Sequence, residues 1–158
     1  IVAETIGEVS RYDESTDSFL PVSRGFAIEQ TTILVVSPNA SLVLSLPGRI
    51  AALVSENSRI VIGPPQNGSF ELGLRSGTVS VLTEPEYEDS SRTPSLTVRT
   101  PSGSTRSSDD GFFAVTQNRG QTYLMTKRGK VEKKSTLLDN PHFSPRPNGR
   151  INGFSPLN

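Results

Sequence analysis

The stretch SLVLSLPGRIAALV, residues 41–54, decides the fold class. Its two halves are short apolar-rich runs, as in paired strands, and Pro47-Gly48 separates them. Proline fixes φ and glycine tolerates a positive φ, which is the combination that a type II turn requires. We therefore predict a hairpin with strands at 41–46 and 50–54.

Similar short runs follow one another along the rest of the chain, separated by residues that favour tight turns. No window of a dozen residues without Pro or Gly shows the apolar spacing of a helix. We expect an all-β fold with no significant helix, with short antiparallel or mixed strands in two layered sheets, as a β-sandwich or a short β-solenoid; a barrel is the remaining alternative. The predicted strands lie at 6–12, 33–36, 59–62, 70–74, 78–82, 96–100, 112–116, 122–126 and 130–133.

Glycine precedes an alternating run three times, at Gly7-Glu8-Val9, Gly77-Thr78-Val79 and Gly129-Lys130-Val131. Such a weak internal repeat favours stacked strand-turn units in which glycine turns the chain into the next strand. In the stretch TVRTPSGSTRSSDDGFFAV, residues 97–115, we expect a structural corner at Thr-Pro-Ser-Gly. The residues predicted to shape turns are Gly7, Gly48, Gly77, Pro101, Gly103, Gly111 and Gly129.

Length and charge limit the classes of function. A chain of 158 residues is long enough for one core, which we assign to residues 1–136 as a single domain. The 16 basic residues balance the 16 acidic ones, so no overall field attracts nucleic acid. The remaining residues, 137–158, form a proline-rich, extended tail whose four prolines rule out a helix or a central strand.

The sequence also suggests a location. It contains no cysteine, which fits a reducing cytosol or a cysteine-poor bacterial exterior. It begins with Ile1, as expected if a leader was removed upstream. Its longest apolar run, 33–36, is too short to span a bilayer. We expect an extracytoplasmic bacterial protein with no membrane span.

No motif predicts catalysis, a cofactor or a metal. The single histidine, His142, lies in the tail with no partner to orient it as a base. The acidic stretch 83–94 matches no calcium-loop spacing, and Asp109-Asp110-Gly111 is a turn signal before it is a carboxylate pair. The basic residues of 127–134 fit a protected edge strand, with sugar or anion binding as the alternative. We expect no enzyme.

A family resemblance adds to these expectations. Four pieces follow in order: glycine-punctuated strands over 70–81, the turn at 98–103, the Gly-x-Phe-x-Val strand at 111–115, and a strand closing in Gly-Lys-Val over 122–131. This order resembles the FecR domain, and the resemblance covers about residues 4–134. It implies an extracytoplasmic β domain, whose best-known members relay receptor status to a sigma factor.

The chain ends lead to a hypothesis of function. A tail with spaced apolar residues is expected to lie against a protein surface, commonly by adding to the edge of a sheet. We expect a non-enzymatic structural or interaction module with protein partners, which self-associates into an oligomer, polymer or filament through its ends. The alternative is a sensory domain of FecR type that binds a receptor or transducer. The apolar residues of this interaction tail are Phe143, Ile151, Phe154 and Leu157.

Overall fold

The computed structural model describes residues 1–84, 95–107, 111–128, 131–134 and 154–156. Every regular element in these ranges is a β-strand, and none is a helix, which confirms the all-β expectation. The described part of the chain accordingly contains no helix of the length and hydropathy needed to cross a membrane.

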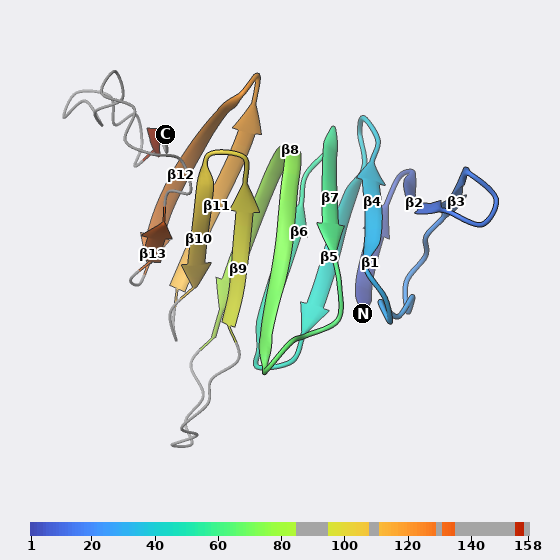
Figure 1. Ribbon diagram of the computed structural model, residues 1–158, viewed down its shortest axis with the longest axis horizontal. Coiled ribbons are helices and arrows are strands. Elements are labelled where there is room, and N and C mark those ends of the chain that lie inside the picture. Colours follow the sequence, from blue (N-terminus) through green and yellow to red (C-terminus); the bar gives the residue numbers. More distant parts are fainter. Residues whose placement is uncertain (85–94, 108–110, 129–130, 135–153, 157–158) are drawn as a thin grey trace.

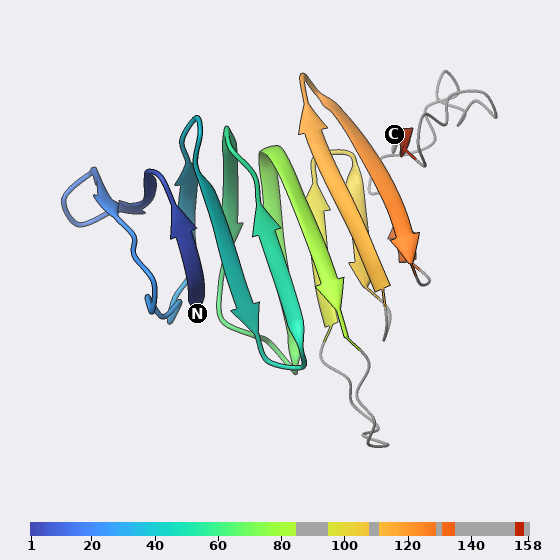
Figure 2. The ribbon, with the colours of Figure 1, turned by 180° about the vertical axis from the view of Figure 1, so that it is seen from behind.

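The strands form one continuous hydrogen-bonded sheet that curls on itself, so that its two halves lie one over the other (Figure 1). Figure 2 shows the back layer from behind. The front layer, in spatial order, contains β3 (Ser18–Pro21), β2 (Val9–Asp13), β4 (Thr32–Val36), β7 (Ser58–Ile62), the first half of β8 (Ser69–Thr83), β9 (Ser95–Thr100), β10 (Gly103–Ser107) and β13 (Val131–Lys134). The back layer contains β1 (Val2–Ile6), β5 (Ser41–Leu46), β6 (Ile50–Val54), the second half of β8, β11 (Gly111–Asn118), β12 (Gln121–Arg128) and β14 (Phe154–Pro156).

The long strand β8 joins the two layers. Its first half pairs with β7 and with β9, the latter in parallel, while its second half pairs with β6 and β11. The bend between them lies at Gly77, where φ is 95°. A Cβ atom there would lie 2.0 Å from Ser58 Oγ and 2.5 Å from Ser58 Cα, so no other residue fits without a shift. The expected pair of layers is therefore one curled sheet, continuous through β8.

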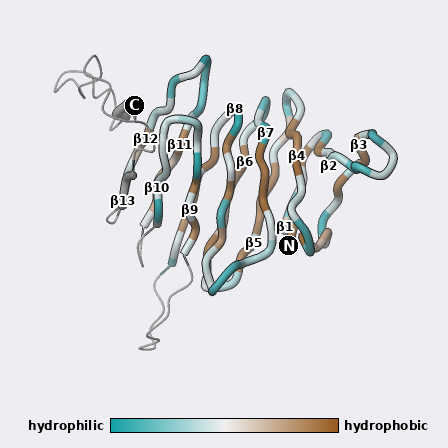
Figure 3. Tube along the Cα trace, viewed as in Figure 1, coloured by the Kyte–Doolittle hydropathy of each residue, from teal (hydrophilic) through white to brown (hydrophobic). Residues whose placement is uncertain are grey.

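The core lies between the layers, where alternate residues of each strand point inward. Leu34, Leu72 and Val98 from the front meet Leu44 and Phe113 from the back, and each is at most 1% exposed. Burying one such side chain contributes about 1.5–3 kcal/mol. Figure 3 shows the hydrophobic residues concentrated along strands such as β4 and β7, with hydrophilic residues at the turns.

The end of the curled sheet at β1 is closed by its own chain. Val2 N–H donates to Phe26 O at 2.9 Å, and Gly25 N–H donates to Val2 O at 2.8 Å, so the outer edge of β1 is paired. The side chains of Phe26 and Ile28 pack against the core. This closing segment protects both the edge and the hydrophobic interior at this end.

Three details differ from the strands predicted from the sequence. Residues 6–12 are not one strand, because Gly7, with φ 71°, ends β1 in the back layer before β2 begins in the front layer. Residues 70–74 and 78–82 are not two strands but parts of β8. The strands β3, β10 and β14 were not expected, since their residues are largely polar or contain proline, and β1 overlaps the predicted strands only at Ile6.

Candidate functional site

The Thr-Pro-Ser-Gly corner joins β9 to β10 within the front layer. Thr100 Oγ1 accepts the Ser102 N–H at 3.3 Å and donates to Gly103 O at 3.2 Å. It also lies 3.1 Å from Thr122 Oγ1 on β12 of the back layer, which in turn contacts Gln117. Thr122 is fully buried. The corner is thus tied across the core to the opposite layer, and its polar groups are used internally.

The other predicted turn residues take different places. Gly7 and Gly77 lie where the chain crosses between layers, and Gly48 lies in the β5–β6 turn with φ 84°. Pro101 is exposed, and Gly103, with φ 156°, opens β10 close to the extended region. Gly111 opens β11 opposite Thr83. Several predicted positions lie outside the described residues: Gly129, His142, Phe143, Ile151, Leu157, most of the acidic stretch after Glu84, and the Asp109-Asp110 pair.

One of the four apolar residues predicted for the interaction tail lies in a described element. Phe154 opens β14, which pairs antiparallel with β12 in the register Met125↔Phe154, Leu124↔Ser155 and Tyr123↔Pro156. The strand β12 runs from Gln121 to Arg128, so β14 matches only its central part. The edge of β12 can therefore accept an extended segment through main-chain hydrogen bonds.

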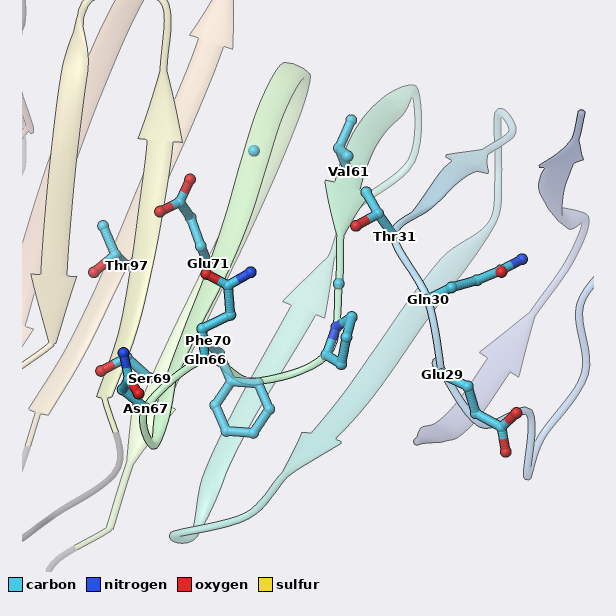
Figure 4. A pocket seen from close by; sticks show the side chains of 13 residues that line it. Glu29, Gln30, Thr31, Val61, Gln66, Asn67, Ser69, Phe70, Glu71 and Thr97 are labelled. Carbon is cyan, nitrogen blue, oxygen red and sulfur yellow. The ribbon is translucent and has the colours of Figure 1, made fainter.

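The front outer face carries a polar cleft of about 730 Å³ between two turns (Figure 4). Glu29 and Gln30 line it from the segment before β4, and Gln66 and Asn67 line it from the turn before β8. Glu71 reaches it from β8. These amide and carboxylate groups can hydrogen-bond a polar ligand, such as a saccharide. The described residues contain no group of three or more His, Cys, Asp or Glu suited to a metal ion.

Arginines supply the positive charge of the front outer face. Arg99 forms an ion pair with Glu71, with Nε 2.9 Å from Oε1, and Arg59 lies over the Phe19 ring at 5.9 Å from its centroid. Arg75 and Arg106 are exposed on the same face. This face therefore presents positive charge beside an exposed aromatic ring, and it suits an acidic partner.

The β2–β3 turn holds the titratable groups with displaced pKa values. The Asp13 carboxylate accepts hydrogen bonds from Ser15 Oγ at 2.7 Å, from Ser15 N–H at 3.1 Å and from Thr16 Oγ1 at 3.1 Å, which lowers its pKa. Tyr12 donates to Asp17, and this hydrogen bond, more than burial or nearby carboxylates, raises the pKa of Tyr12. These contacts shape an exposed turn and do not prepare a catalytic base.

The back outer face has the opposite chemistry. We define it as the outward positions of β5, β6, the second half of β8, β11 and β12. In Figure 2 no described element covers it. Leu53 on β6 is 43% exposed, and Thr78 Oγ1 and Thr116 Oγ1 share a hydrogen bond of 2.9 Å. Its central positions are uncharged, while β12 ends in Lys127 and Arg128, the latter in register with Phe112. These central positions are Ser41, Val43, Ser45, Ala51, Leu53, Thr78, Ser80, Leu82, Phe112, Ala114, Thr116, Tyr123 and Met125.

Sequence reasoning missed this face, although a signal was present. Apolar residues occupy both faces of β5 and β6, as in LVL and IAALV, instead of alternating with charged ones. Strands that are buried on both sides have such near-continuous apolar runs. The cleft was missed because its residues come from separate turns with no motif of their own.

Comparison with known proteins adds a fold likeness. No protein-family model and no curated protein matches the sequence. Two crystal structures, both described as candidate anti-sigma factors from Parabacteroides distasonis, share the fold with TM-scores of 0.54 and 0.51. Each is 14% identical, over 67% and 66% of this chain, which shows the fold alone. This chain spans about half of theirs, 48% and 47%.

Proposed function

We propose that this chain is a protein-interaction domain of a regulatory protein of the anti-sigma-factor type. The observation that carries the proposal is the fold shared with the two anti-sigma-factor structures. The FecR-like order of strands and turns over residues 70–131 supports it, and membership of the FecR family is part of the proposal. An extracytoplasmic location is part of the same proposal.

The domain works by binding and not by turnover. The hydrogen bonds of Thr100, Thr122 and Gln117 support this, because these side chains bond within the protein and hold the two layers together. The displaced pKa values of Tyr12 and Asp13 have their cause within one exposed turn. Two broad outer faces of different chemistry are what a binding module needs.

The test is genetic. The segment encoding residues 1–158 is deleted in frame from the chromosomal gene of the producing bacterium, and transcripts are sequenced. We expect a discrete group of genes that share one promoter motif to change in abundance. An unaltered transcriptome would contradict the regulatory role, and an altered envelope with unaltered transcripts would favour a structural subunit.

Self-association through the chain ends is the second candidate function, and the pairing of β14 with β12 favours it. The same three register pairs can form between two copies, because exchange of an identical element preserves every contact. Residues 135–153 lie between β13 and β14, so about 60 Å of extended chain is available for the exchange.

Cysteine pairs test this exchange in a chain that has no native cysteine. Directly opposed residues of antiparallel strands have Cα atoms about 4.5–5.5 Å apart, within disulfide range. Met125→Cys is made in one copy and Phe154→Cys in another, and the two are mixed and oxidised. Exchange predicts a mixed disulfide dimer. A bond that forms only within the double variant, and never between the single variants, would exclude it.

A further inference from the structure

A glycine in the middle of a strand lines the polar cleft of the front outer face. Gly73 lies inside β8, paired with Val61 on β7 and with Arg99 on β9. Glycine in a strand interior costs about 0.5–1 kcal/mol relative to alanine. Such a glycine commonly marks a bulge, a tight bend, or a place where a ligand or another backbone approaches closely.

The backbone does not require glycine at this position. Gly73 is not among the residues with positive φ, and the irregularity in the pairing of β7 with β8 lies between Arg59 and Ile60. Among the described residues, a Cβ atom at Gly73 would meet only Val61 within 4 Å, in ordinary contact at 3.7 Å. Because Leu72 points into the core, a side chain at the next residue would project outward into the cleft. Glycine here therefore keeps the cleft open.

The polar side chains around the cleft are not used by the fold. In the part of the chain that the structure describes, the side chains of Glu29, Gln30 and Gln66 form no hydrogen bond, and the Thr97 hydroxyl forms none. These groups come from three separate segments and surround one space. They are therefore available to a ligand that both donates and accepts hydrogen bonds.

The charges of the cleft favour a neutral ligand. The Glu71 carboxylate is held by Arg99 through both oxygens, with Nε 2.9 Å from Oε1 and Nη2 3.0 Å from Oε2. No arginine or lysine is among the described residues that line the cleft, so an acidic ligand would find no cation there. An apolar ligand would leave the amide groups unpaired. A neutral ligand rich in hydroxyl groups, which is a saccharide, avoids both costs.

A second cleft, of about 720 Å³, adjoins the first and shares Gln30 and Thr31 with it. In Figure 4 Thr31 points toward β7, and Gln30 points to the other side of the segment. Tyr12 lines the second cleft and supplies an aromatic ring, which can pack against the apolar C–H face of a sugar. Adjoining clefts with repeated polar groups suit a chain of sugar units better than a single sugar.

We infer that these two clefts together bind a neutral oligosaccharide, with one sugar unit over Gly73 and with Gln30 contacting the chain where the clefts meet. The first cleft, of about 730 Å³, has the size of a small-molecule site, about 300–1,000 Å³. The inference does not depend on the regulatory function. A domain whose deletion leaves the transcripts unchanged can still bind a sugar, so the two proposals fail separately.

A glycan array tests the inference. The chain of residues 1–158 is applied to immobilised maltohexaose, cellohexaose, laminarihexaose and chitohexaose, with hexasaccharides of hyaluronan and alginate as acidic counterparts. We expect binding to at least one neutral hexasaccharide, and calorimetry should find that hexasaccharide bound more tightly than its disaccharide. Binding to none of the neutral hexasaccharides, or to the acidic ones alone, would overturn the inference.

Valine at the glycine position locates the site. Gly73→Val should weaken hexasaccharide binding by at least about tenfold without lowering the free energy of unfolding, because valine favours strands and its Cβ has room. The matched control is Ser80→Val, at an outward position of the same strand on the back outer face, which should bind like wild type. Gln30→Ala should weaken binding about two- to tenfold, the loss expected for one hydrogen bond.

Three results with these variants would contradict the inference. One is Gly73→Val protein that binds as wild type does. Another is a Gly73→Val variant that urea denaturation finds destabilised, since the fold itself would then require the glycine. The third is Gln30→Ala protein with unchanged affinity for the hexasaccharide, which decides the question even if Gly73→Val loses its β spectrum in circular dichroism.

Discussion

The two outer faces of this curled sheet share one backbone architecture and differ in chemistry. The front face carries Arg59, Arg75, Arg99 and Arg106 beside a polar cleft, whereas the back face is uncharged around Leu53. Inward positions on both layers are mostly apolar, because the core requires it, and buried polar side chains such as Thr122 and Gln117 hydrogen-bond each other. The outward positions are under no such packing requirement, so their composition is free to differ between the two faces.

The largest expected effect comes from removing the bend that creates two faces. Gly77→Ala should lower the free energy of unfolding by about 3 kcal/mol, because the new Cβ meets Ser58 and alanine disfavours a φ of 95°. The bend is also held by the Thr78 N–H, which donates to Ser58 Oγ at 3.1 Å. Urea denaturation measures the loss.

Gly120→Ala is the matched control for this bend. Gly120 has φ 76° in the β11–β12 turn, but a Cβ there meets nothing within 4 Å. Alanine should therefore cost only the conformational strain, about 1 kcal/mol. Equal losses in the two variants would show that φ alone, and not the approach of β7 to β8, explains the glycine at the bend.

The tie between the layers gives the next effect. Thr122→Val removes the hydroxyl that bridges Thr100 and Gln117 and takes its donor from the buried Gln117 amide oxygen, so it should cost about 1–3 kcal/mol. Thr83→Val should have the opposite sign. Thr83 Oγ1 is buried without a hydrogen-bond partner among the described residues, and its replacement by a methyl group should stabilise the fold by about 1 kcal/mol. Thermal unfolding of both variants shows whether each substitution stabilises or destabilises the fold. A stabilising Thr122→Val would refute the proposed link between the two layers.

The sequence predicts the middle of this molecule best. The hairpin at 41–46 and 50–54 coincides with β5 and β6 because its turn chemistry and apolar runs are local. The same holds for β4, β7 and β9 within a residue or two. Local patterns do not show that Gly77 lies inside a continuous strand, since that depends on the approach of Ser58 from another strand.

Three features of the structure depend on pairing between distant parts of the chain, so local sequence patterns do not predict them. The strand β10 reads as a polar link, Ser104 to Ser107, and becomes a strand because β9 and β13 flank it. The segment that closes the β1 end, with Phe26 and Ile28, has no strand pattern and is placed by backbone bonds to Val2. The back outer face emerges only when β5, β6, β8, β11 and β12 are set side by side.

The front-face ion pair should contribute little to folding. The side chains of Arg99 and Glu71 are 53% and 58% exposed, so water and salt screen the pair. Glu71→Gln should lower the free energy of unfolding by less than about 1 kcal/mol in dilute buffer and by nothing measurable in molar salt. Urea titrations at both salt concentrations test this. A large, salt-independent loss would mean that the front face has a structural role comparable with the core.

The smallest expected effect lies at the turn between β2 and β3, at the far edge of the front layer. Hydrogen bonds from Ser15 and Thr16 stabilise the Asp13 carboxylate and lower its pKa from 3.8. Because the pKa of the carboxyl is lower in the folded state than in the unfolded state, its ionisation stabilises the fold at pH values above the unfolded-state pKa. This stabilisation is lost as the pH falls through the folded-state pKa. Carbon-detected NMR should therefore find Asp13 titrating below 3.8. Ser15→Ala removes the principal donor to the Asp13 carboxylate, so the pKa of Asp13 should rise. An Asp13 pKa that Ser15→Ala leaves unchanged would show that these hydrogen bonds do not set it.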